Sequence, residues 1–168
     1  MEQHPLIILG SARKNSDTYK LVTNLFAGKV YYELDLLDHK IAPYSYSGEY
    51  PENDQFQDVV QQMLHHTTII FATPVYWYAM SGPMKDLFDR FTDLVTIDKP
   101  SGRQMKGKRI FLLAVGAEDL LPKGFEEPFA LTSDYFEMQY KGCYYCRTTE
   151  TDRLLGKDNF LEKFYSNI

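Results

Sequence analysis

The sequence has little cysteine: its 168 residues include only Cys143 and Cys146. Two thiols do not make a disulfide scaffold for a chain of this length. Their C-x-x-C spacing would also suit a redox pair or half of a metal site. The segment reads as a strand, however, in which residues three apart face opposite sides at about 10 Å, whereas a disulfide needs Cα atoms within about 7 Å. No second cysteine pair completes a cluster, so we expect structural cysteines and no metal site.

Positive charge and long apolar runs are also scarce. The formal net charge is −5, and Lys and Arg form no cluster of the kind that binds phosphate backbones. No segment approaches the roughly 18 apolar residues that span a bilayer. The first residues, MEQHPLIILG, lack the basic start and long apolar stretch of a signal peptide. We therefore expect a cytoplasmic protein that binds neither nucleic acid nor membrane.

What the sequence does have is enough apolar material for one domain, residues 1–168. Apolar residues make up 44% of the chain, and aromatic residues a high 15%. Aromatic side chains fill cores, but they also line sites for flat ligands.

Apolar runs alternate with amphipathic runs along the chain. Three unbroken apolar runs, 6–9, 68–72 and 110–115, are each followed by turn residues and predict strands buried on both faces. Weaker strands are expected within 30–36 and 138–148. Helices with apolar residues on one face are expected over 21–26, 56–64, 84–94, 125–135 and 154–165, with Asp152 as a cap of the last.

This order predicts a fold class. Strands joined by helices imply right-handed crossovers, and therefore a three-layer, doubly wound α/β protein. With five parallel strands, the flavodoxin-like order 2-1-3-4-5 fits best. Two longer stretches, 38–53 and 96–107, are expected to be irregular, and 38–53 is a candidate lid.

In such a sheet, ligands bind beyond the carboxyl ends of the strands where the strand order reverses. The first strand is followed there by GSARKNSDTYK. Its hydroxyls, its arginine and a helix beginning at Ser16 or Asp17 would suit a phosphate group. The same residues would also suit an ordinary helix cap. Neither G-x-x-x-x-G-K-[ST] nor G-x-G-x-x-G is present, so nucleoside-triphosphate and dinucleotide fingerprints are missing.

The third strand is followed by TPVYWYAMSGPMKDLFDRF. Tyr76, Trp77 and Tyr78 place three rings in one loop, and Pro83 is well suited to the first turn of the next helix. A flat heterocycle would cover these rings. Packing against a partner chain or against residues 38–53 is the alternative. In the following helix, Lys85, Asp86, Asp89 and Arg90 are expected to form a solvated face.

Both loops resemble those of the NADPH-dependent FMN reductase and NAD(P)H:quinone oxidoreductase families. GSARKNSDT resembles their phosphate loop, G-S-x-R-x-x-S-x-T, and PVYWYAMSGPMKDLFDR resembles their flavin loop. The resemblance implies bound FMN, NAD(P)H as co-substrate, a small electron acceptor (a quinone, flavin, azo or nitro compound) and a homodimer or a dimer of dimers. It implies cofactor contacts from Ser11, Arg13, Ser16, Asp17, Thr18, Pro74, Val75, Tyr76, Trp77, Tyr78, Gly116, Ala117 and Glu118.

The chemistry in such proteins belongs to the cofactor, so we expect no catalytic acid or base. A non-enzymatic electron carrier of the flavodoxin type is the alternative. The modest net charge, Arg13 and the Tyr-Trp-Tyr sequence favour the reductase.

Overall fold

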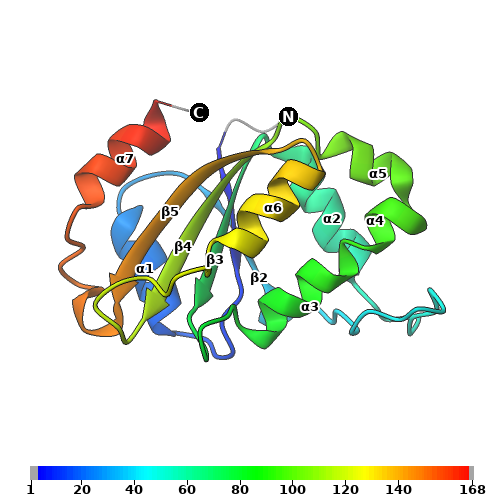
Figure 1. Cartoon of the computed structure of the whole chain (residues 1–168), viewed down its shortest axis with the longest axis horizontal. Helices are drawn as coiled ribbons and strands as arrows, with labels where there is room; N and C mark the ends of the chain where they lie inside the picture. The colour runs from blue at the N-terminus through cyan, green and yellow to red at the C-terminus, as the bar shows by residue number, and fades with distance from the viewer. Residues whose placement is uncertain (1–3, 167–168) are drawn as a thin grey trace.

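The computed structural model describes residues 4–166. Its five strands form one parallel sheet in the order β2-β1-β3-β4-β5, shown in Figure 1. The predicted order is therefore confirmed. The strands are β1 (Leu6–Leu9), β2 (Tyr32–Asp35), β3 (Thr68–Pro74), β4 (Arg109–Gly116) and β5 (Gln139–Arg147).

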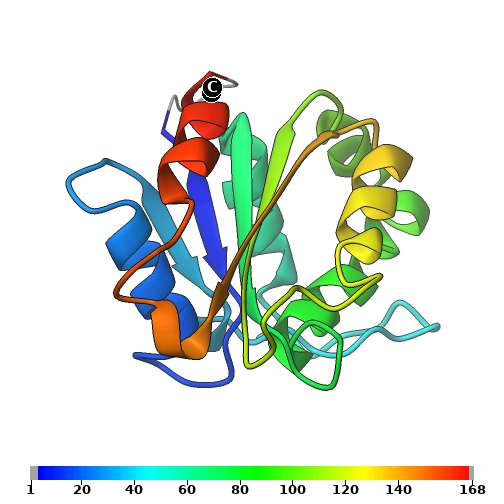
Figure 2. The ribbon, with the colours of Figure 1, turned by 60° about the vertical axis from the view of Figure 1, so that its left-hand side comes forward.

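Helices cover both faces of the sheet, as Figure 2 shows along its edge. One face carries α1 (Asp17–Leu25) and α7 (Lys157–Tyr165). The other face carries α2 (Phe56–His65), α3 (Gly82–Arg90), α4 (Asp93–Thr96), α5 (Lys99–Gln104) and α6 (Glu127–Tyr135). Short 3-10 turns, η1 (Leu36–Asp38) and η2 (Thr148–Glu150), follow β2 and β5.

The continuous apolar runs have a simple cause in this arrangement. Successive strand residues point to opposite faces: Leu6 and Ile8 pack in the core beneath α2–α6, whereas Ile7 and Leu9 pack beneath α1 and α7. Because both faces are covered, no position of β1 can be polar without burying a polar group. Among residues 4–166, no helix combines the length and apolar character that crossing a bilayer requires.

The cysteines lie on β5 as expected. Cys143 belongs to the core beneath α6 and Cys146 to the core beneath α7, so they face opposite sides of the sheet and remain free thiols. Within the described residues, His, Cys, Asp and Glu side chains form no group of three or more that could hold a metal ion.

Several boundary predictions were wrong. Residues 96–107 are not irregular: Asp98 accepts a hydrogen bond from Ser101 N (3.3 Å) and begins α5. The predicted helix 84–94 breaks after Arg90. Asp152 does not cap the last helix, because α7 begins after Gly156 with a left-handed φ of 74°. The third strand runs two residues beyond the predicted end, to Pro74, which pairs with Val115.

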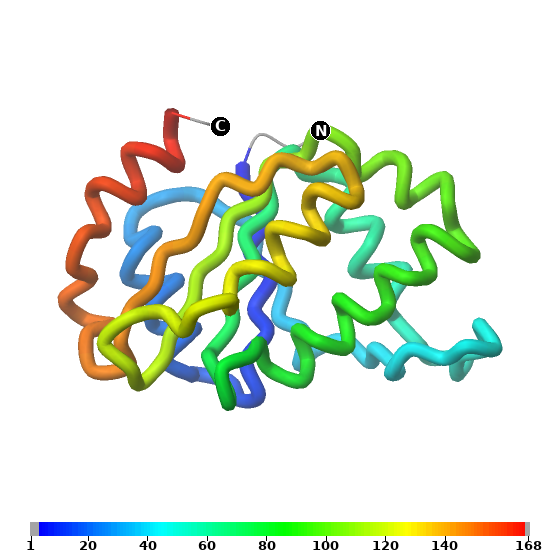
Figure 3. Tube along the Cα trace, in the orientation of Figure 1, coloured from blue at the N-terminus to red at the C-terminus, as the bar shows by residue number. Residues whose placement is uncertain are grey.

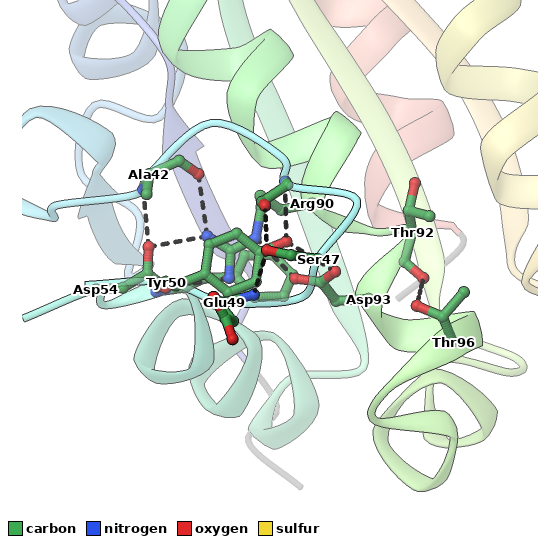
Figure 4. A network of polar contacts seen from close by, with 11 residues as sticks. Ala42, Ser47, Glu49, Tyr50, Asp54, Arg90, Thr92, Asp93 and Thr96 are labelled. Carbon is green, nitrogen blue, oxygen red and sulfur yellow. Dashed lines mark hydrogen bonds and ion pairs between the residues drawn. The ribbon is translucent and has the colours of Figure 1, made fainter. Parts of the chain in front are cut away.

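Arg90 is also placed differently from the prediction of a solvated face. Its side chain is 3% exposed and forms ion pairs with Asp54 (2.8 Å) and Asp93 (2.7 Å). Its guanidinium lies 3.4 Å from the ring centroid of Tyr50, and Nη1 donates to the Ala42 carbonyl at 3.0 Å, as Figure 4 shows. Apart from Asp93, which is three residues away, these partners lie in a different part of the chain, so the local helix pattern could not reveal them. The exposed pair Lys85–Asp89 (2.6 Å) does form as predicted.

Arg90 thereby holds the arm segment, residues 39–55, which runs beside α3 as an extended strip in Figure 3. Asp54 also accepts a hydrogen bond from Ala42 N (2.7 Å), and the Tyr50 hydroxyl donates to Asp93 at 3.0 Å. The base of the arm segment is therefore fixed by buried polar contacts.

Candidate functional site

Three loops that follow β1, β3 and β4 lie together at one edge of the sheet, the lower edge in Figure 1. Their strands are neighbours, and β1 marks the point where the strand order reverses. This is the edge where open α/β sheets bind ligands. Every residue that the sequence suggested for the site belongs to one of these loops or to the strand or helix end beside it.

Two buried hydroxyls that have no partner lie after β1, one in the first loop and one in the first turn of α1. Ser11 is 4% exposed and Thr18 is 1% exposed, and neither Ser11 Oγ nor Thr18 Oγ1 has a hydrogen-bond partner. Leaving a buried hydroxyl unpaired costs about 1–3 kcal/mol. Both residues flank the N-terminus of α1, where backbone N–H groups and the helix dipole favour an anion. A phosphate group placed there would supply the missing hydrogen bonds.

Ser16 has a structural role at the same position. Its side chain accepts a hydrogen bond from Tyr19 N at 3.2 Å and caps α1. Ser16 therefore acts as an ordinary helix cap, whereas the hydroxyls of Ser11 and Thr18 are left available for a ligand. A hollow of about 130 Å³ adjoins the loop and is lined in part by Ser11, Arg13 and Ser16.

The two cations of this loop are held differently. Lys14 Nζ contacts Asp35 at 2.8 Å and Asp38 at 2.6 Å, and the hydrogen bonds that it donates to these carboxylates raise its pKa. Arg13 has a side chain that is 70% exposed, with one long contact to Asp17 of 3.6 Å. Lys14 therefore ties the loop to the end of β2, and Arg13 is the cation that can turn toward a bound anion.

The second loop presents the three rings. Tyr76 and Ala79 exchange backbone hydrogen bonds of 2.9 and 3.0 Å around Trp77 and Tyr78. Trp77 has φ of 48° and Tyr78 has φ of 65°, a left-handed conformation that is costly for bulky side chains. Trp77 is 93% exposed and Tyr78 is 68% exposed. The backbone is thus strained to hold apolar rings in solvent, which suits a surface that a ligand covers.

Ser81 joins the first two loops. Its hydroxyl donates to the Gly10 carbonyl, its N–H donates to Thr73 Oγ1 at 3.1 Å, and its Oγ accepts from Met84 N at 3.3 Å. A Cβ on Gly10 would lie 2.6 Å from Met84 Cε, so glycine is needed for this close approach. Arg13 and Trp77 accordingly belong to loops that meet at one site.

The third loop begins at Gly116, which is buried, and continues through the exposed Ala117 and Glu118. Tyr145 Oη donates to the Glu118 carbonyl at 2.6 Å. Sequence reasoning missed Tyr145, Ser81 and Thr73. The S-G pair before α3 was a usable signal for Ser81, whereas nothing local marks Tyr145, because its role depends on the pairing of β5 with β4.

The strand order defines a flavodoxin-like α/β protein, and the three loops at one edge of its sheet form the candidate ligand site. The model of the NADPH-dependent FMN reductase family matches residues 5–121, and the chain belongs to that family. It is accordingly an oxidoreductase that uses FMN and NAD(P)H.

Known relatives agree with this assignment. YwqN of Bacillus subtilis strain 168, whose provisional name is NAD(P)H-dependent FMN-containing oxidoreductase, is 27% identical over 147 residues, which are 81% of this chain and 80% of that protein. The Trp repressor binding protein from Bacillus subtilis has a similar fold, with a TM-score of 0.68, 24% identity and coverage of 90% of this chain and 98% of that one. An FMN-dependent NADH-azoreductase from Bacillus anthracis, solved with FMN, has a TM-score of 0.63, 11% identity and coverage of 98% and 95%.

Proposed function

We propose that residues 1–168 form a single FMN-binding domain that uses NAD(P)H to reduce a small acceptor, such as a quinone, flavin, azo or nitro compound. The single observation that carries this proposal is the pair of unpartnered buried hydroxyls, Ser11 and Thr18, at the N-terminus of α1. The segment that carries these hydroxyls is joined to the loop that carries Trp77 by the hydrogen bond from Ser81 to the Gly10 carbonyl.

In this proposal the protein binds and orients. The phosphate of FMN is bound by Ser11, Arg13 and Thr18. The first turn of α1 is set by Ser16 and Asp17. The isoalloxazine ring of FMN is supported by residues 74–78. Residues 116–118 border the isoalloxazine ring on the side of β4. A bound FMN would supply the redox chemistry between NAD(P)H and the acceptor, and we assign no catalytic acid or base to the protein.

Because the aromatic side chains of residues 76–78 are exposed, one side of the proposed isoalloxazine site is open to solvent. A nicotinamide or an acceptor can approach there in turn, since both must reach the same face of the cofactor. A partner subunit beside this loop would shield the site further, and we propose a homodimer on that basis. The absence of a membrane-spanning helix in residues 4–166 and the family activity are compatible with the cytoplasmic location that we propose.

Family membership favours the enzyme over the carrier. Anaerobic mixing of the FMN-loaded protein with NADPH and with NADH tests this choice. Loss of the visible flavin absorbance within seconds, followed by its return on addition of a quinone or an azo dye, is the expected result. A flavin that binds but is not reduced over minutes by either nucleotide would contradict the reductase, and no binding of FMN would contradict the whole proposal.

A further inference from the structure

The loop at residues 116–121 is held by two side chains from the end of β5. We infer that Tyr145 and Arg147 are positioning residues for this loop: Tyr145 fixes its backbone, and Arg147 fixes Asp119 and offsets its charge beside the flavin. The effect on the flavin rests on the proposed function, whereas the effect on the loop does not.

Strand register explains why these two residues reach the loop. In the β4–β5 ladder, Tyr145 is opposite Ala114 and Arg147 is opposite Gly116, the last residue of β4. Residues two apart on a strand point to the same face. Tyr145 and Arg147 therefore stand side by side at the place where the chain leaves β4 and enters the loop.

Tyr145 fixes the path of the loop backbone. Its hydroxyl donates to the Glu118 carbonyl at 2.6 Å. A Cβ on Gly116 would lie 2.7 Å from that hydroxyl and 3.3 Å from Val75 Cβ, so the ring passes over a position that only glycine leaves open. Val75, the residue before Tyr76, lies against Gly116 as well, and its N–H donates to the Val115 carbonyl at 2.7 Å. The third loop and the Tyr-Trp-Tyr loop are therefore positioned together.

Arg147 acts on the acidic part of the loop. One of its Nη atoms contacts Asp119 Oδ1 at 2.6 Å, and the other pairs with Glu150 in η2. The Asp119 side chain is 86% exposed. An unpaired carboxylate beside the ring would oppose the arrival of electrons there, because like charges repel. Arg147 thus makes reduction of the cofactor easier than the acidic sequence Glu118-Asp119 alone would allow.

The first test measures the loop in the protein without FMN. Hydrogen–deuterium exchange of residues 117–121 is compared between wild type, Tyr145→Phe and Tyr144→Phe. Tyr144 is the matched control, since its hydroxyl donates to the Leu155 carbonyl at 2.9 Å on the other face of the same strand. Faster exchange of residues 117–121 in Tyr145→Phe alone is expected. Equal exchange in all three proteins would overturn the positioning role, whatever FMN does.

The second test measures the bound flavin. Tyr145→Phe is expected to weaken FMN binding about three- to tenfold, as the loss of one hydrogen bond does. Arg147→Gln is expected to make the reduction potential of bound FMN more negative, and Arg147→Lys is expected to keep it closer to that of wild type. Lys141→Gln is the control, because it makes the same change of charge toward the other end of β5. It is expected to leave the reduction potential unchanged. A potential that is the same in Arg147→Gln and wild type would refute the electrostatic role while leaving FMN binding itself established.

Discussion

The hydroxyl of Ser81 donates a hydrogen bond to the carbonyl of Gly10, so the first turn of α3 is bonded directly to the end of β1. The two residues are 71 positions apart, yet each is buried in a segment that leads out of a strand into a helix. This contact makes one site of two sequence motifs. Any change that alters this hydrogen bond is expected to affect both the loop that follows β1 and the loop that follows β3.

Removing an unpartnered hydroxyl should affect ligand binding without harming the fold. Ser11→Ala is expected to leave the stability of the FMN-free protein unchanged or to raise it by up to about 1 kcal/mol, because the hydroxyl has no protein partner to lose. The same change should weaken FMN binding about tenfold or more, the effect of one hydrogen bond to a charged group. Urea unfolding of the FMN-free protein and fluorescence titration with FMN measure the two effects.

Ser133→Ala is the control for this prediction. Its hydroxyl is also buried but donates to the Phe129 carbonyl at 2.7 Å within α6. We expect this change to lower stability by about 0.5–1.5 kcal/mol and to leave FMN affinity unaltered. If Ser11→Ala lost as much stability as Ser133→Ala and kept its affinity, the phosphate site would lie elsewhere.

Adding one methyl group at Gly10 should disturb the junction. Gly10→Ala places a Cβ 2.6 Å from Met84 Cε and 2.9 Å from Met84 Cβ, and we expect a loss of about 1–3 kcal/mol of stability together with weaker FMN binding. Gly82→Ala is the comparison, because no atom lies within 4 Å of its new Cβ. Its stability is expected to stay within about 1 kcal/mol of wild type. Thermal unfolding with and without FMN distinguishes the two variants.

Truncating Arg90 should be far more damaging than truncating an exposed cation of the same helix. Arg90→Met leaves Asp54 and Asp93 buried without their partner, which typically costs about 3–5 kcal/mol. Lys85→Met removes only the exposed pair with Asp89 and is expected to cost less than about 1 kcal/mol. Urea unfolding at neutral pH measures both, and similar losses would contradict the buried network.

The same network gives stability a dependence on acid pH. Burial alone would raise the pKa of Asp54, but hydrogen bonds from Arg90 and two backbone amides hold it below the ordinary value of 3.8. A carboxylate with a lowered pKa contributes stability that is present above its unfolded value and is lost as the pH falls through the folded one. Wild type should therefore lose stability below about pH 4 more steeply than Asp54→Asn. Parallel slopes would show that Asp54 does not carry this effect.

Lys108 should make stability rise with pH as well, but in the alkaline range. It is buried, its Nζ donates to the Leu64 and His66 carbonyls at 3.0 and 2.6 Å, and burial lowers its pKa from 10.5 to about 8. Between these values the unfolded chain binds the proton more tightly, so stability is expected to rise with pH in that window. The rise should be absent from Lys108→Met and retained by Lys123→Met, which changes an exposed lysine. Urea unfolding from pH 7.5 to pH 10, about the window in question, makes the comparison.

Much of the fold could be predicted from local sequence. The apolar runs of β1, β3 and β4 identify strands buried on both faces, and alternation with amphipathic helices leads to the parallel sheet order. The two candidate loops could be found because each follows such a strand, and ligand sites of this architecture lie at strand ends. The order of strands and helices and the spacing of apolar residues are properties of residues that are close in sequence, so they can be read from a single sequence.

Other features were decided only by the tertiary structure. The charge pattern of α3 predicted Arg90 on a solvated face, because its partner Asp54 lies 36 residues away and approaches only through the arm segment. The role of Tyr145 depends on its register with Ala114, and that of Ser81 on the closeness of β1 and β3. A side chain's burial and partners follow from which segments the fold brings together, and those contacts leave no local periodicity in the sequence.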